Sequence, residues 1–130
     1  MSMASTGHWY VLIETNTVYD GDNLWSLTEK LPVEGGREEA IGRAEELSLS
    51  YEPGPYPSAP ETCGRTVFRT SQTSWLVESE QSLWHQGWTA PATLSQLMRI
   101  TVAELVSARP APPAEPPVKR GRLRRARRAD

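Results

Sequence analysis

Only one stretch of this sequence, residues 35–51, has the spacing of an α-helix. Its apolar residues recur at steps of four, three and four and form a single stripe. They are Ala40, Ala44, Leu47 and Tyr51, with Ile41 beside them. Glu38 and Glu39 stand in the first turn, where the helix dipole favours negative charge, and Glu39 is spaced to pair with Arg43. A single amphipathic helix has to bury its stripe against another element, so the rest of the chain must supply a sheet.

The segments before the helix alternate as β-strands do. Residues 8–15 carry apolar side chains on both faces, which is typical of a central strand. Trp9, Val11 and Ile13 fall on one face and Tyr10 and Leu12 on the other. Residues 24–31 predict a half-buried second strand that ends at Pro32, with Trp25, Leu27 and Leu31 sharing one side. We expect these two strands to form a hairpin with a longish loop.

The sequence after the helix predicts a loop and then further strands. Four prolines make residues 52–62 an extended surface loop. Strand-like segments follow at 65–70, at 74–78 and 82–86 (two arms of a hairpin around 79–81) and at 97–102. Residues 87–93 predict a turn, and a capping box at Thr101–Glu104 predicts a short helical turn through Val106. We expect an α+β fold of order β-β-α-β-β-β, with an antiparallel sheet of about five strands and one main helix on one face.

Charge divides the 130 residues into two unequal parts. Residues 1–107 hold 6 Lys and Arg against 14 Asp and Glu, a net charge of −8, whereas residues 108–130 hold 8 against 2, a net of +6. We therefore expect a flexible N-terminus (1–7), a single acidic domain (8–107), a proline-rich spacer (108–118) and a basic disordered tail (119–130). A chain of this length excludes a two-domain enzyme, a long repeat array and a polytopic membrane protein.

Residue usage bears on the compartment. The N-terminus carries no basic region followed by an apolar run, so it does not resemble a secretory signal. The single cysteine, Cys63, has no second cysteine in the chain for a disulfide. Twelve arginines against two lysines indicate a high-GC bacterial genome. We expect a cytoplasmic protein.

Four short segments resemble a group of small actinobacterial α+β proteins of unknown function. They are Trp9–Glu14, Glu34–Ala40, Tyr51–Pro53 and Ile100–Leu105. The resemblance extends over most of residues 9–106 and implies the same order of strands and helix. It implies no catalytic residue, because every matching segment is structural in character.

Few residues suit catalysis or ligand binding. Cys63, His8 and His85 are far apart in sequence and lack the spacing of metal ligands, so we expect no metal and no cofactor. Cys63 with His85 is the one candidate nucleophile and base, and it supports only a distant third hypothesis, a small enzyme. Gly35-Gly36 is followed by Glu38 and Glu39, whose charge would repel a phosphate. We expect a protein that is not an enzyme.

The five tryptophans suggest two kinds of environment. Trp9, Trp25 and Trp75 are expected to fill the core between helix and sheet. Trp84 and Trp88 are candidates for protein interaction on an exposed face, although burial in the core is the alternative for them too.

The C-terminal tail is the clearest candidate for charged partners. Its seven cations within ten residues are Lys119, Arg120, Arg122, Arg124, Arg125, Arg127 and Arg128. The leading hypothesis is a non-enzymatic binding module whose sheet contacts a protein partner or a second copy, and whose tail attaches weakly to DNA or RNA without sequence preference. The alternative is a structural interaction protein, in one version a homodimer, whose tail pairs with acidic protein surface. A solubilising tail that reflects coding bias alone also stays open, and no membrane partner is expected.

Overall fold

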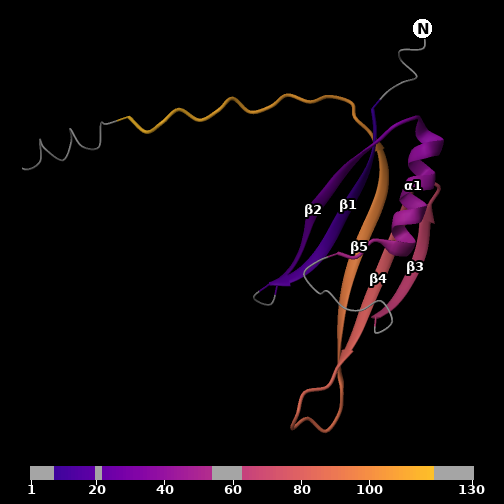
Figure 1. The fold of residues 1–130 in the computed structure, drawn as a ribbon. Coiled ribbons are helices and arrows are strands. Elements are labelled where there is room, and N and C mark those ends of the chain that lie inside the picture. The colour runs from indigo at the N-terminus through magenta and orange to yellow at the C-terminus, as the bar shows by residue number, and fades with distance from the viewer. Residues whose placement is uncertain (1–7, 20–21, 54–62, 119–130) are drawn as a thin grey trace, which may run out of the picture.

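One antiparallel sheet and one helix are formed by the residues that the computed structural model describes, which are 8–19, 22–53 and 63–118 (Figure 1). The elements are β1 (Trp9–Tyr19), β2 (Asp22–Val33), α1 (Arg37–Ser50), β3 (Cys63–Ser71), β4 (Ser74–Leu83) and β5 (Ala92–Glu104). The predicted α+β order, the five antiparallel strands and the single helix are confirmed.

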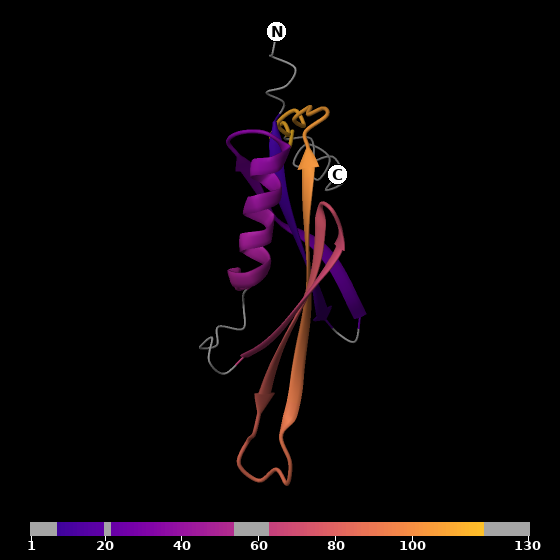
Figure 2. The ribbon, with the colours of Figure 1, turned by 90° about the vertical axis from the view of Figure 1, so that its right-hand side faces the viewer.

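The sheet joins a hairpin to a three-stranded meander. Its strand order is β2-β1-β5-β4-β3, and every neighbouring pair is antiparallel. β1 lies between β2 and β5, which confirms the central strand predicted from its two apolar faces. The helix connects β2 to β3 and lies against one face only (Figure 2).

The core lies between α1 and that face of the sheet. Ala40, Ala44 and Leu47 of the predicted stripe are buried, and Ile41 and Tyr51 pack at its margin. The sheet contributes the other buried side chains, Val11, Ile13, Trp75, Val77, Met98, Ile100 and Val102. Trp75 is 3% exposed, and Trp9 packs against the cluster, so the prediction of core tryptophans is confirmed at these two positions.

The helix start is built from two glycines and a glutamate. Gly35 has a φ of +111°, and a Cβ placed on it would stand 2.8 Å from the Glu39 Cγ, so the turn into the helix requires glycine there. The Gly36 N–H donates to the Glu39 Oε1 at 2.7 Å and holds the pKa of that carboxyl below its usual value. The predicted pair of Glu39 with Arg43 is wrong, because Arg43 pairs with Glu46 while Glu39 caps the helix.

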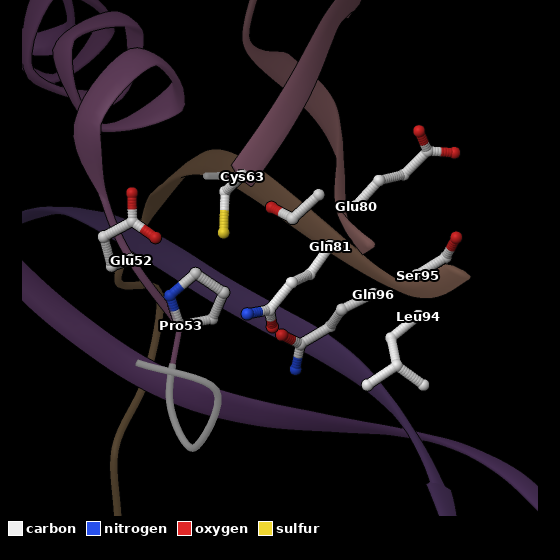
Figure 3. Close-up of a pocket in the computed structure, with 9 residues that line it drawn as sticks. Glu52, Pro53, Cys63, Glu80, Gln81, Leu94, Ser95 and Gln96 are labelled. Carbon is white, nitrogen blue, oxygen red and sulfur yellow. The ribbon is translucent and has the colours of Figure 1, made fainter. Parts of the chain in front are cut away.

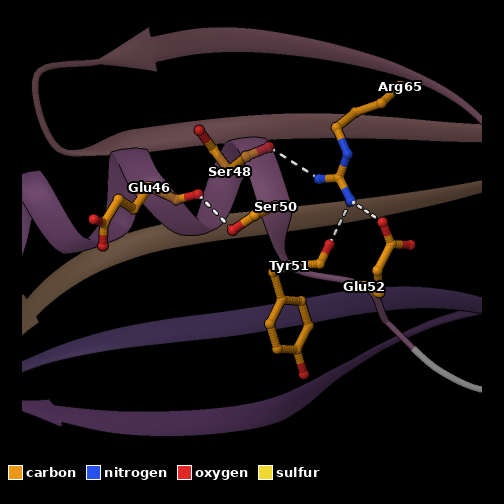
Figure 4. A network of polar contacts seen from close by, with 6 residues as sticks. All are labelled: Glu46, Ser48, Ser50, Tyr51, Glu52 and Arg65. Atoms are coloured by element: carbon orange, nitrogen blue, oxygen red, sulfur yellow. Dashed lines mark hydrogen bonds and ion pairs between the residues drawn. The ribbon is translucent and has the colours of Figure 1, made fainter. Parts of the chain in front are cut away.

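The C-terminal end of α1 is held by an arginine of β3, the next strand in the chain. α1 has no basic residue in its last turn, and Arg65 of β3 reaches over to it instead (Figure 4). Its guanidinium donates to the Ser48 carbonyl at 3.0 Å, to the Tyr51 carbonyl and to the Glu52 carboxylate at 3.0 Å. A cation at the C-terminal carbonyls complements the helix dipole, so Arg65 ties α1 to the sheet edge.

Three local expectations are wrong. β4 runs unbroken through residues 79–81, because both of its sides pair there, with β3 and with β5. The polar sequence that suggested a turn is therefore strand, and the connection to β5 lies at residues 84–91. The capping-box sequence also stays extended, because β5 pairs with β1 as far as Glu104. The expected longish loop between the first two strands is wrong as well, because β1 and β2 pair as far as Tyr19 and Asp22.

The chain leaves the sheet at the end of β5. Residues 105–118 form no helix or strand, and every one of them is exposed (Figure 1). The predicted N-terminus, most of the proline loop (54–62) and the basic tail (119–130) lie outside the described residues. In the described part of the chain, α1 is neither long nor apolar enough to cross a membrane.

Candidate interaction surface

The face of the sheet opposite α1 has no helix or strand over it among the described residues (Figures 1 and 2). We call it the open face. The strand registers place on it Tyr10, Leu12, Glu14 and Asn16 of β1, Trp25, Leu27, Lys30 and Pro32 of β2, Leu97, Arg99, Thr101 and Ala103 of β5, Ser74, Leu76 and Glu78 of β4, and Thr66 and Phe68 of β3.

A β-bulge sends two of these side chains to the open face. Thr28 is an extra residue in β2, since Ile13 pairs with Glu29 whereas Glu14 pairs with Leu27. The Thr28 and Thr15 hydroxyls share a hydrogen bond of 2.8 Å that holds the bulge in place. Because an extra residue inverts the alternation, Trp25 and Leu27 lie opposite to Leu31. The prediction that these three share a side, and that Trp25 belongs to the core, is wrong.

The open face is more apolar than the solvent side of a sheet usually is. Trp25 is 38% exposed, Leu27 50% and Phe68 51%. Solvent-facing positions of an antiparallel sheet are normally polar, and large apolar residues grouped there indicate a contact surface. At one end of the face, residues 105–108 line a groove of about 680 Å³ together with Tyr10 and Pro32, so the segment after β5 forms one wall of this groove.

A neutral charge pair lies near the centre of the open face. Arg99 and Glu14 are opposite each other on β5 and β1, and the guanidinium donates to the carboxylate at 3.3 Å. The same guanidinium lies 4.3 Å from the ring centre of Trp25, a cation–π contact. Leu27 is the next residue outward on one side and Leu76 on the other. The row across four strands is therefore Leu27, Glu14, Arg99 and Leu76.

Trp84 and Trp88 are at one end of the molecule. They are 62% and 44% exposed and lie in the β4–β5 connection. The prediction that Trp84 belongs to a strand is therefore wrong. The His85 ring stands edge-on to Trp88 with ring centres 4.5 Å apart. β5 connects this loop to the exposed C-terminal segment, residues 105–118. The loop with the two tryptophans and the segment that leads to the basic tail therefore lie at opposite ends of β5 (Figure 1).

Cys63 and His85 are not brought together. Cys63 pairs with Gln81 at the start of β3, whereas His85 lies beyond the end of β4. The pocket beside the Cys63 thiol has a volume of about 30 Å³, is lined also by Gln81 and Gln96, and has no histidine in its described lining (Figure 3). A space of this size admits a water molecule or two. In the described ranges, no group of three or more His, Cys, Asp or Glu side chains could hold a metal ion.

The cations predicted to bind nucleic acid, Lys119 to Arg128, lie outside the described residues. Comparison with protein-family models, with curated proteins and with solved structures finds no match to this chain. The resemblance to small actinobacterial proteins therefore stays a prediction.

The sequence did not reveal the central row of the open face. The one indication of this surface in the sequence is that residues 8–15 carry apolar side chains on both faces, which predicts a contact on the second face of β1 as well. Strict alternation predicts the other face for Leu27, because it does not include the bulge. Arg99 and Leu76 come into the row with Glu14 only through strand pairing.

Proposed function

We propose that this chain is a non-enzymatic binding module. Its sheet contacts a protein through the open face, and its basic tail attaches weakly to DNA or RNA. The observation that carries the proposal is the uncovered apolar face, since Trp25, Leu27 and Phe68 remain exposed on a sheet whose other face already holds the core. Trp25 and Leu27 lie on the edge strand β2 and Phe68 on the opposite edge strand β3, and exposed aromatic and aliphatic side chains of this kind are common anchors of protein contact surfaces.

The exposed C-terminal segment supports the nucleic-acid part of the proposal. Residues 105–118 are fourteen residues rich in proline, which in an extended conformation span about 40 Å. Charges in physiological salt are screened beyond about 8 Å. A spacer of this reach lets the tail cations act on phosphates at a distance from the acidic body.

Affinity for a random-sequence DNA duplex, measured at two salt concentrations, tests the tail. Each neutralised phosphate contributes about −0.9 to the slope of log K against log salt, so seven cations give a slope of up to about −6. A full-length variant with the seven cations from Lys119 to Arg128 replaced by glutamine is expected to lose this binding. Arg109→Gln is the matched control in the spacer and is expected to retain most of it.

Two results would contradict the proposal for the tail. One is binding that does not change with salt, and the other is binding that survives the loss of all seven cations. The competing function, a tail that pairs with acidic protein surface, is favoured by the exposed glutamates of α1, whose Glu38 and Glu46 side chains are 83% and 71% exposed. It predicts no affinity for the DNA duplex, either in the native chain or in the seven-glutamine variant.

A further inference from the structure

The central row of the open face has a symmetric chemistry. From β2 to β3 it consists of Leu27, Glu14, Arg99, Leu76 and Phe68. Opposite charges stand on the neighbouring strands β1 and β5, a leucine flanks them on each side, and Phe68 lies beyond on the edge strand β3. Glu14 and Arg99 are direct partners across β1 and β5, and they therefore lie at the same height on the sheet. A surface with this pattern complements itself when it is turned over.

We infer that the open face binds a second copy of this chain, face to face, about a two-fold axis that runs parallel to the strands between β1 and β5. The inference rests on the use of the open face in the proposed function and names its partner. The rotation places Glu14 of each copy over Arg99 of the other, and Leu27 of each copy over Leu76 of the other. Two-fold interfaces use the same patch on both subunits, as this arrangement does.

The neighbouring rows are compatible with the same axis. Lys30 and Ser74 belong to the row of Leu12 and Thr101, so Lys30 of one copy would lie over Ser74 of the other. On the other side of the central row, Asn16 would lie over Leu97, and Trp25 over Glu78. No like charges are opposed in the three rows, so the stacking meets no electrostatic obstacle there.

The overlap is large enough for a specific dimer. β2, β1 and β5 run together over eight paired residues and β4 over five of them, which at a strand spacing of about 4.8 Å and a rise of about 3.4 Å gives about 470 Å² of flat contact per copy. Two copies together bury about 950 Å² before the relief of side chains is counted, which is close to the smallest area of a biological interface. We therefore expect a reversible dimer rather than an obligate one.

The dimer would give the tails a common direction. An axis parallel to the strands leaves the C-terminal ends of both β5 strands at the same end of the assembly. Both exposed segments, 105–118, would then start side by side and carry two basic tails to one nucleic acid. Two linked weak sites bind more tightly than either alone, so this geometry suits a tail with low affinity of its own.

Sedimentation equilibrium of the full chain, alone and as charge-reversed variants, tests the inference. We expect the unmodified chain to show a monomer–dimer equilibrium. Glu14→Arg opposes two arginines across the interface, and Arg99→Glu opposes two glutamates, so each variant alone is expected to dimerise at least tenfold more weakly. An equimolar mixture of the two variants restores opposite charges across the interface and is expected to dimerise again.

Rescue in the mixture separates a contact between copies from the ion pair within one copy, because the internal pair stays broken in both variants. Glu34→Arg, at an exposed position between β2 and α1, is the control and is expected to leave dimerisation unchanged. Leu27→Ser, at a position already 50% exposed, weakens the dimer without depending on charge. Circular dichroism confirms that each variant is folded.

A full chain that stays monomeric would overturn the inference, and so would a mixture that behaves like its separate components. Neither result touches the nucleic-acid part of the proposed function, which is measured as salt-dependent affinity for DNA. If the mixture dimerises but the tail does not bind DNA, the face-to-face dimer is supported and the proposed nucleic-acid binding is refuted.

Discussion

Replacing Arg65 by methionine tests how the C-terminal end of α1 is held against the sheet. The Arg65 side chain is 17% exposed, and its guanidinium contacts the Ser48 and Tyr51 carbonyls and the Glu52 carboxylate. Methionine keeps an apolar stem of similar length and removes every donor. The variant therefore isolates the hydrogen bonds from the contribution of the stem.

The size of the effect follows from these contacts. A hydrogen bond that involves a charged group contributes about 1.5–3 kcal/mol, and water replaces part of this at a helix end. The pair with Glu52, whose side chain is 49% exposed, adds at most about 1 kcal/mol. We expect Arg65→Met to lower the free energy of unfolding by about 2–3 kcal/mol, which for a domain of this size lowers Tm by roughly 8–20 °C.

Urea unfolding, followed by tryptophan fluorescence and far-ultraviolet circular dichroism, measures the loss. Arg65→Lys keeps the charge but not the planar fork of donors, so it should fall between the native chain and Arg65→Met. Glu52→Gln removes the ion pair alone and is expected to cost less than about 1 kcal/mol. The reasoning fails if Glu52→Gln costs as much as Arg65→Met, or if Arg65→Met is within about 0.5 kcal/mol of the native chain.

Three other substitutions have expected outcomes. The hydrogen bond from the Gly36 N–H lowers the pKa of the Glu39 carboxyl below 4.5, so the ionised carboxylate stabilises the fold above pH 4.5 and this stabilisation is lost as the pH falls through the lowered value. In acid unfolding, Glu39→Gln should therefore lose less stability than the native chain between neutral and acidic pH. Burial, and then the hydrogen bond to Glu29, raise the pKa of the Tyr51 hydroxyl above 10.0. The stabilisation that the neutral hydroxyl contributes is therefore present below pH 10 and is lost as the pH rises through the raised pKa. In a series of urea unfolding midpoints at alkaline pH, Tyr51→Phe should show a weaker dependence on pH than the native chain. Val77→Ala empties a fully buried site and should cost about 2 kcal/mol in urea unfolding, and a loss under about 0.5 kcal/mol would contradict the core described above.

The local hydrophobic pattern predicts an element correctly where strand pairing and packing favour the same conformation as the pattern. The stripe of α1 and the alternation of residues 97–102 each predicted a face that the structure buries. Pattern failed where pairing partners decided the conformation. Residues 79–81 have the composition of a turn, but strands on both sides hold them extended, and residues 101–104 remain in β5 for the same reason.

The candidate surface was less predictable because it depends on one extra residue. Nothing in the sequence around Thr28 marks a bulge, and strict alternation assigns Trp25 and Leu27 to the core side. The pairing of Glu14 with Arg99 joins residues 85 positions apart in the chain. Contacts at such separation follow from the strand order, which the sequence alone did not provide.

The two outer strands of the sheet have a bearing on how large an assembly of this protein can become. An unpaired strand edge can recruit another chain, and then another, so growth along edges has no natural end and produces fibres. β2 has Pro32, which lacks an N–H, and the bulge at Thr28, while β3 is irregular between Arg69 and Ser71. These interruptions break the regular row of donors and acceptors on which filament growth depends. Association across faces stops by itself when each copy offers one uncovered face, as the described part of this chain does, and the sheet is thereby suited to closed, finite association.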